Sequence, residues 1–195
     1  MGRRFDLDHL TAALGHAPAR PSSDYDLNPL AALPPGRVLR PAAVLIGVLG
    51  RDVILTKRAS TLKHHPGQIA LPGGGVDAGE TVAEAALREA QEEIGLDPAN
   101  VALLAELPPH ETVTGYTVTP LLARIEADFT PLPEPGEVEE VFRVPLAFLM
   151  DPANYAIEGR RWRGQRRDYF VVPYGPHYIW GATARMLKSL ADTVA

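Results

Sequence analysis

Residues 74–96, GGVDAGETVAEAALREAQEEIGL, carry the strongest structural signal in the chain. Thr81–Ile94 is rich in alanine, a strong helix former, and Gly95 is well placed to end a helix, with Pro98 following soon after. Helical residues advance by roughly 100° each. One apolar stripe therefore contains Val82, Ala85, Ala86, Ala90 and Ile94. This pattern predicts an amphipathic helix that packs on a core.

Three glutamates fall on or beside that stripe. Glu89 and Glu93 lie within it, one turn apart, and Glu92 lies at its edge, so the three share an arc of roughly 100°. A solvated acidic face is the common meaning of a charge run. Acids that face a core, however, are costly unless they are paired or bound to metal. Oxygen-only ligation suits Mg²⁺ or Mn²⁺, so the helix indicates a divalent metal site.

The segment before the helix supports this interpretation. Pro72 and the glycines at 73–75 let the backbone approach a ligand closely, and the segment leads to a helix N-terminus, which attracts phosphate. A glycine triplet alone is more often a turn. Joined to the acidic helix, it indicates a metal held against a phosphate chain. On another face of the helix we expect Glu84 and Arg88 to pair at i,i+4.

Composition limits the alternatives. A chain of 195 residues suits one domain with a small appendage. The absence of cysteine excludes disulfides, thiolate metal sites and cysteine nucleophiles. A net charge of −5 disfavours nucleic acid as a partner. We expect no signal peptide and no membrane span, and therefore a cytoplasmic protein.

The remaining chain predicts an α+β fold with a mixed sheet. A proline-rich arm over 17–41 follows a short helix at 5–14, so 1–40 is expected to pack as an arm on a domain of residues 41–195. Residues 58–75 are expected to be a loop. The expected strands are 42–49, 53–57, 101–107, 113–125, 138–144, 155–162 and 167–173, with a helical turn at 146–150 and a closing helix at 183–193.

Eight positions in the opening stretch resemble the Nudix box, G-x5-E-x7-R-E-U-x-E-E-x-G-U. They are Gly74, Glu80, Arg88, Glu89, Glu92, Glu93, Gly95 and Leu96, while Ala90 stands where the family prefers a bulkier aliphatic residue. The resemblance implies the Nudix fold, a mixed sheet between helices. It also implies hydrolysis of a nucleoside diphosphate linked to another moiety.

The same resemblance implies roles for the box residues. Glu89, Glu92 and Glu93, with the Gly74 carbonyl, would bind Mg²⁺ or Mn²⁺, and Glu80 and Arg88 would orient the carboxylates. The general base varies within the family. It would be a box glutamate such as Glu89 or a later acid, and the later candidates, which could also be ordinary surface acids, are Glu137, Glu139 and Glu140.

The segment upstream of the box is similar to an additional signature of coenzyme A (CoA) pyrophosphatases, L-L-T-x-R-[SA]-x3-R-x3-G-x3-F-P-G-G. Ile54, Lys63 and Leu71 depart from that signature. The likeness implies cleavage of CoA or its thioesters to 3′-phosphoadenosine 5′-phosphate (3′,5′-ADP) and 4′-phosphopantetheine or its acyl form. The implied substrate-binding residues are Arg58, Lys63, His65, Gly73 and Gly74. For His65, a loop histidine that caps its own backbone is the alternative.

Other functions stay open at this point. The chain could be a Nudix hydrolase for another substrate such as ADP-ribose, or a catalytically silent nucleotide-binding regulator, although a silent domain has no need for three crowded acids. The expected partner is a small molecule, CoA or acyl-CoA, with no nucleic acid or membrane, and the protein is expected to be a monomer or homodimer. Five arginines at 160–167 surround Trp162. They suit a phosphate-rich nucleotide or, more simply, a solvated hairpin with Trp162 packed inward.

Overall fold

The computed structural model describes residues 6–16, 20–29, 36–162 and 164–194. Its helices are α1 (Leu7–Leu14), α2 (Val82–Ile94), α3 (Leu146–Leu149) and α4 (Gly181–Val194), with 3₁₀ turns at Pro98–Asn100 and Pro152–Asn154. Its strands are β1 (Ser22–Ser23), β2 (Arg40–Leu49), β3 (Asp52–Arg58), β4 (Ile69–Ala70), β5 (Gly73–Gly75), β6 (Val101–Glu106), β7 (His110–Glu111), β8 (Tyr116–Ile125), β9 (Val138–Pro145), β10 (Ala156–Trp162) and β11 (Gln165–Val171).

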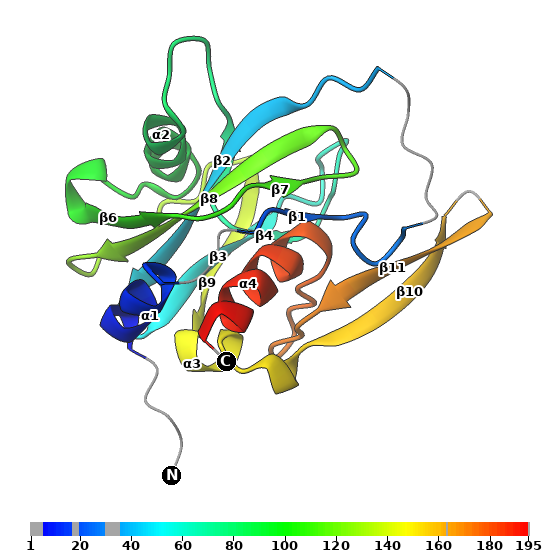
Figure 1. Cartoon of the computed structure of the whole chain (residues 1–195). Helices are drawn as coiled ribbons and strands as arrows, with labels where there is room; N and C mark the ends of the chain where they lie inside the picture. Colours follow the sequence, from blue (N-terminus) through cyan, green and yellow to red (C-terminus); the bar gives the residue numbers. More distant parts are fainter. Residues whose placement is uncertain (1–5, 17–19, 30–35, 163, 195) are drawn as a thin grey trace.

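A mixed sheet of nine strands forms the centre of the molecule, with β2 in its middle. β2 runs parallel to β8 over ten residues and antiparallel to β3 and β5. Helix α2 covers one face of this sheet, and α1 and α4 cover the other (Figure 1). Successive β2 residues alternate between the two faces. Leu45 packs in the core beneath α2, and Ile46 packs in the core beneath α1 and α4. The expected α+β fold is confirmed.

Helix α2 is favoured by capping residues at both of its ends and by an apolar face that is buried. Thr81 accepts a hydrogen bond from Glu84 N, and the Glu84 carboxylate accepts one from Thr81 N, which makes a capping box. Gly95 ends the helix in the left-handed conformation, with φ 69°. The expected stripe of buried alanines is confirmed. The expected pair between Glu84 and Arg88 is wrong, because the cap engages Glu84 and Arg88 turns to other carboxylates.

The segment expected to be a loop at 58–75 contains two short strands. β4 pairs with β3, and β5 pairs with Ala42–Val44 of β2. The glycines permit this pairing. Gly73 has φ 153°, and a Cβ on it would lie 2.2 Å from the Ala43 carbonyl oxygen. The glycine triplet is therefore a strand, and at Gly73 it lies too close to β2 for a side chain.

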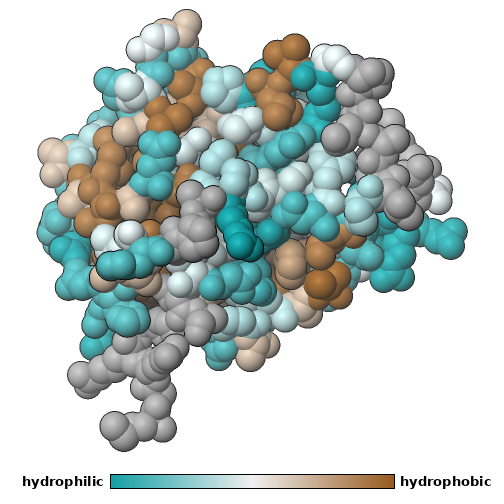
Figure 2. Space-filling view, in the orientation of Figure 1, coloured by the Kyte–Doolittle hydropathy of each residue, from teal (hydrophilic) through white to brown (hydrophobic). Residues whose placement is uncertain are grey.

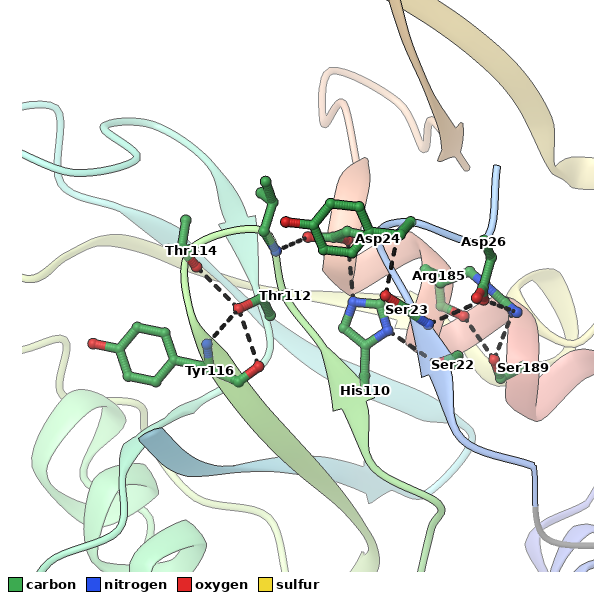
Figure 3. A network of polar contacts seen from close by, with 12 residues as sticks. Ser22, Ser23, Asp24, Asp26, His110, Thr112, Thr114, Tyr116, Arg185 and Ser189 are labelled. Atoms are coloured by element: carbon green, nitrogen blue, oxygen red, sulfur yellow. Dashed lines mark hydrogen bonds and ion pairs between the residues drawn. The ribbon is translucent and has the colours of Figure 1, made fainter. Parts of the chain in front are cut away.

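The N-terminal arm is joined to the domain by polar contacts (Figure 3). β1 pairs with β7, and Ser22 Oγ lies 2.9 Å from Nδ1 of the fully buried His110. The other ring nitrogen of His110 lies 3.1 Å from Asp24. Arg185 of α4 donates to Asp26, and Asn28 exchanges two hydrogen bonds with the backbone of Asp168. Other parts of the expected helix and arm, at 5, 17–19 and 30–35, lie outside the described residues.

The C-terminal third follows the expected order of elements. β10 and β11 form a separate two-stranded antiparallel sheet, which confirms that the expected strands at 155–162 and 167–173 pair as a hairpin, and α4 closes the chain. The side chain of Trp162 and all of Arg163 lie outside the described structure, so the expected inward packing of Trp162 stays a prediction. In the part of the chain that the structure describes, no helix is long and apolar enough to cross a membrane.

Candidate active site

Strand β5 and helix α2 lie against each other at the box residues. A Cβ built on Gly74 would lie 2.4 Å from Oε1 of Glu89, so the Glu89 carboxylate rests directly on the Gly74 backbone. One turn further along α2, Glu93 Oε2 accepts a hydrogen bond of 3.2 Å from Gly73 N. Two glutamates therefore point from the helix to the glycine strand, on the inward side that the periodicity predicts.

Burial makes these two carboxylates costly to ionise. Glu93 is only 5% exposed, and burial raises its pKa from 4.5 to about 7. Burial also raises the pKa of Glu89, although its hydrogen bond from Arg88 works in the opposite direction. A nearby cation would restore the charged forms. The electrostatics of this pair therefore suit a bound cation.

Arg88 connects the carboxylates of the site. Its guanidinium donates to both oxygens of Glu80, at 2.9 and 3.1 Å, to Glu89 at 3.0 Å and to Glu92 at 3.1 Å. It also donates to the Gly75 carbonyl at 3.0 Å. The hydrogen bond from Arg88 is the main reason that the pKa of Glu80 is lowered. Arg88 and Glu80 thus hold Glu89 and β5 in place without lying on the buried face themselves.

The donor set fits a hard divalent ion only in part. Glu89, Glu93 and the Gly74 carbonyl offer oxygen ligands, and the missing Gly74 side chain leaves room beside Glu89. The Glu92 side chain is 58% exposed and is turned to Arg88. Within the described residues, no three acidic, histidine or cysteine side chains are close enough to share one ion. The structure brings two of the three expected acidic ligands to the glycine strand.

Arg58 joins the box residues from the upstream segment. It ends β3, where it pairs with Val138 of β9. Its positive charge lowers the pKa of Glu93 and so offsets part of the rise that burial causes. Arg58 Nε is buried and has no hydrogen-bond partner among the described residues. A buried cationic donor without a partner is uncommon in folded proteins. This donor is therefore open to an anionic ligand, and the charge of Arg58 reaches Glu93.

The other upstream residues lie farther out. Lys63 and His65 are exposed in the turn between β3 and β4, and His65 has a positive φ of 55°. Partial desolvation and the charge of Arg58 lower the pKa of His65. No hydrogen bond or ion pair joins Lys63 or His65 to the box in the described structure. Of the three basic residues expected here, only Arg58 acts on the box directly.

The three acids near the start of β9 have different environments. Glu139 is engaged by Lys57 Nζ at 2.7 Å and Ser60 N at 3.2 Å. Glu140 lies 3.6 Å from His177. The charge of Glu137, in contrast, helps to raise the pKa of both Glu89 and Glu93. Of the three later acids, Glu137 is thus the one whose charge acts on the box glutamates.

The turn before β9 explains the position of Glu137, which the sequence did not reveal. Glu134 N donates to the Glu93 carbonyl and Leu132 N to the Ile94 carbonyl, both at 2.9 Å. The Glu137 carbonyl accepts from Ala59 N at 2.8 Å. The turn is therefore fixed to the end of α2 on one side and to the end of β3 on the other. The prolines at 131–135 signal a turn here but not its contacts.

Comparisons with known proteins agree with the box. The profile of the NUDIX domain matches residues 38–163. An uncharacterized Nudix hydrolase, NudL, from Cronobacter sakazakii is 40% identical over 156 residues, which cover 78% of this chain and 81% of that protein. NudL from Escherichia fergusonii is 39% identical over the same lengths.

A solved structure shows the same fold. The MutT protein from Methanosarcina mazei Go1 superimposes with a TM-score of 0.51 at 17% sequence identity, over 83% of this chain and 96% of that one. The family profile and the sequence relatives carry the assignment of family. This chain belongs to the Nudix hydrolases, which act on nucleoside diphosphate derivatives and generally use divalent ions such as Mg²⁺ or Mn²⁺.

Proposed function

We propose that this Nudix hydrolase cleaves the pyrophosphate of CoA or its thioesters. The products are 3′,5′-ADP and 4′-phosphopantetheine or its acyl form. The observation that carries the proposal is Arg58, which comes from the upstream signature, has a buried Nε without a partner among the described residues, and acts through its charge on Glu93. A guanidinium in that position suits a phosphate oxygen. The charge of Arg58 thus connects the CoA-type segment with Glu93 of the box.

Glu89, Glu92, Glu93 and the Gly74 carbonyl would hold the metal. Glu92 would exchange its contact with Arg88 for this role, while Arg88 and Glu80 would keep Glu89 oriented. A bound divalent ion neutralises the pyrophosphate and acidifies a water molecule. The burial of Glu93 favours such an ion, because an unpaired carboxylate there is costly.

Glu137 is the preferred general base. Its charge acts on Glu89 and Glu93, and its main chain is fixed to the end of β3, whereas Lys57 already engages Glu139. Its carboxylate takes a proton from the attacking water, whose oxygen bonds to one phosphorus while the bridging P–O bond breaks. The leaving phosphate departs with the electron pair of that bond. Arg58 offsets charge on the phosphate chain as the bond breaks.

A substrate panel tests the proposal. CoA, an acyl-CoA, ADP-ribose and a nucleoside triphosphate are each incubated with the protein and Mg²⁺ or Mn²⁺, and kcat/KM is compared. We expect kcat/KM for CoA or acyl-CoA to exceed that for ADP-ribose by about tenfold or more, which corresponds to about 1.4 kcal/mol of transition-state binding. An equal or lower value for CoA would reject the CoA assignment.

The same panel separates an enzyme from a silent nucleotide-binding regulator. Glu93→Gln removes one proposed ligand with little change of shape, and Glu106→Gln is a matched exposed control on β6. We expect no turnover by the first variant and normal turnover by the second. Activity in the Glu93 variant equal to the native protein would overturn the ligand assignment, and no turnover of any substrate by the native protein would favour a regulator.

A further inference from the structure

The outer end of the β10–β11 hairpin carries four arginines on two neighbouring cross-strand pairs. Arg160 lies opposite Arg167, and Arg161 lies opposite Arg166. Because side chains alternate between the faces of a strand, one pair lies on each face of the hairpin. These four residues, the arginine collar, surround the hairpin just behind its turn. Like charges directly opposite each other destabilise a strand pair. The collar therefore lowers the stability of the hairpin, and a role in folding does not account for it.

Few acids in the structure offset this charge. Arg166 Nε donates to Asp168 at 2.8 Å, and its side chain crosses Gly159, where a Cβ would lie 2.7 Å from Arg166 Nε. For the other three collar arginines, no carboxylate lies within ion-pair distance in the described part of the chain. The collar therefore leaves most of its charge available to an external anion.

The collar is separate from the Nudix box. The hairpin is a sheet of its own and projects from the domain at the side away from α2 (Figure 1). Its outer end is hydrophilic in the space-filling view (Figure 2). The whole chain has a net charge of −5, although five arginines lie within 160–167. The charge is thus strongly polarised, with a basic tip on an acidic body.

We propose that the arginine collar docks the protein, hairpin tip first, on a bilayer surface rich in anionic phospholipids. The next cross-strand positions inward are Gly159 with Asp168 and Glu158 with Tyr169. A nucleic acid lying along the hairpin would meet those acids, whereas a flat surface that approaches the outer end of the hairpin would reach the collar before it reaches them. Long arginine side chains from both faces can reach the same plane of phosphates, and anionic leaflets attract such basic clusters. The inference rests on the hairpin alone and not on the substrate, and it departs from the sequence-based expectation that no membrane is a partner.

Vesicle sedimentation tests this docking. The full chain is mixed with phosphatidylcholine vesicles that contain phosphatidylglycerol or none, at low and high salt. We expect binding only to the anionic vesicles and its loss at high salt. The variant R160Q/R161Q/R166Q/R167Q should reduce the partition constant roughly 100-fold or more, since each arginine near an anionic surface contributes a factor of about five.

A charge-matched control isolates the collar from net charge. R20Q/R51Q/R124Q/R143Q also removes four arginines, all outside the hairpin, and should keep most of the binding. Thermal melts and hydrolase activity check that both variants are folded. Equal loss in the two variants, no binding to anionic vesicles at low salt, or tight binding to a single-stranded oligonucleotide with none to vesicles would each overturn the proposal.

Discussion

At the residue scale, the three glycines of β5 have different neighbours although they are adjacent in sequence. A Cβ on Gly73 would meet the Ala43 backbone carbonyl at 2.2 Å, one on Gly74 would meet the Glu89 carboxylate at 2.4 Å, and one on Gly75 has nothing within 4 Å. Backbone cannot move aside, whereas the end of a glutamate side chain can. The same substitution should therefore harm stability at one position and activity at the next.

Alanine at each position tests this difference. Gly73→Ala should lower the free energy of unfolding by about 2 kcal/mol or more, because of the clash and its φ of 153°. Gly74→Ala should displace Glu89 and reduce kcat by roughly 100-fold with a smaller loss of stability. Gly75→Ala, the control, should change stability by less than about 0.5 kcal/mol. Urea melts and initial rates check all three, and full activity in Gly74→Ala would contradict the contact with Glu89.

The buried Glu93 also predicts a pH dependence of the metal-free protein. Its pKa rises from 4.5 to about 7 on folding. A carboxyl group whose pKa is raised by folding stabilises the folded state only while it is protonated. The contribution of Glu93 to the free energy of unfolding is therefore complete below about pH 4.5 and is lost as the pH rises through 7. In chelator, the native protein should lose about 3 kcal/mol relative to Glu93→Gln across that window. If the free energies of unfolding of the two proteins change with pH in the same way, Glu93 does not destabilise the folded protein when it ionises.

At the scale of elements, α2 owes its start to a reciprocal cap. Thr81 Oγ1 accepts from Glu84 N, and Glu84 accepts from Thr81 N. Thr81→Ala should lower the free energy of unfolding by about 1 kcal/mol. Thr130→Ala, an exposed position outside the helices and strands, is the control and should have little effect. Thermal melts compare the two variants. Equal melting temperatures would mean that the cap does not stabilise the protein.

Elements with a local signal could be predicted from the sequence. Helix α2 and its end follow from periodicity and from the glycine at 95, and the structure has that glycine at φ 69°. β5 could not be predicted, because three glycines carry no alternation and their partners in β2 are about 30 residues away. Helix spacing alone also missed the contacts of Arg88, although the resemblance to the Nudix box implied that Arg88 and Glu80 orient the carboxylates. Sequence spacing offered Glu84 as its partner, but the cap already uses Glu84, and Glu80 lies two turns away.

At the scale of the whole molecule, the N-terminal arm depends on contacts between distant residues. Ser22 and His110 are 88 positions apart and no pattern in the sequence joins them. The same holds for Asn28 and Asp168, 140 positions apart. The sequence therefore predicted an arm that packs on the domain but none of its contacts. The cytoplasmic location and the monomeric or dimeric state stay predictions.

The arm should loosen when its buried histidine is removed. His110→Ala leaves Ser22 and Asp24 without their partner and should cost about 2–4 kcal/mol. Hydrogen exchange should rise at Ser22 N and Asp24 N, which donate to Pro109 and Glu111 carbonyls. The amide of Ala59, bonded to Glu137 at the site, serves as an internal control. Uniform acceleration at all three amides would mean global destabilisation and not a loosened arm.

The identity of the cleaved bond connects all three scales, because it depends on the box, on Arg58 and on the fold that brings them together. The protein is incubated with CoA and Mg²⁺ or Mn²⁺, and the products are identified by mass. We predict 3′,5′-ADP and 4′-phosphopantetheine in equal amounts. Intact CoA under conditions in which ADP-ribose is cleaved would contradict the proposed substrate while leaving the Nudix chemistry in place.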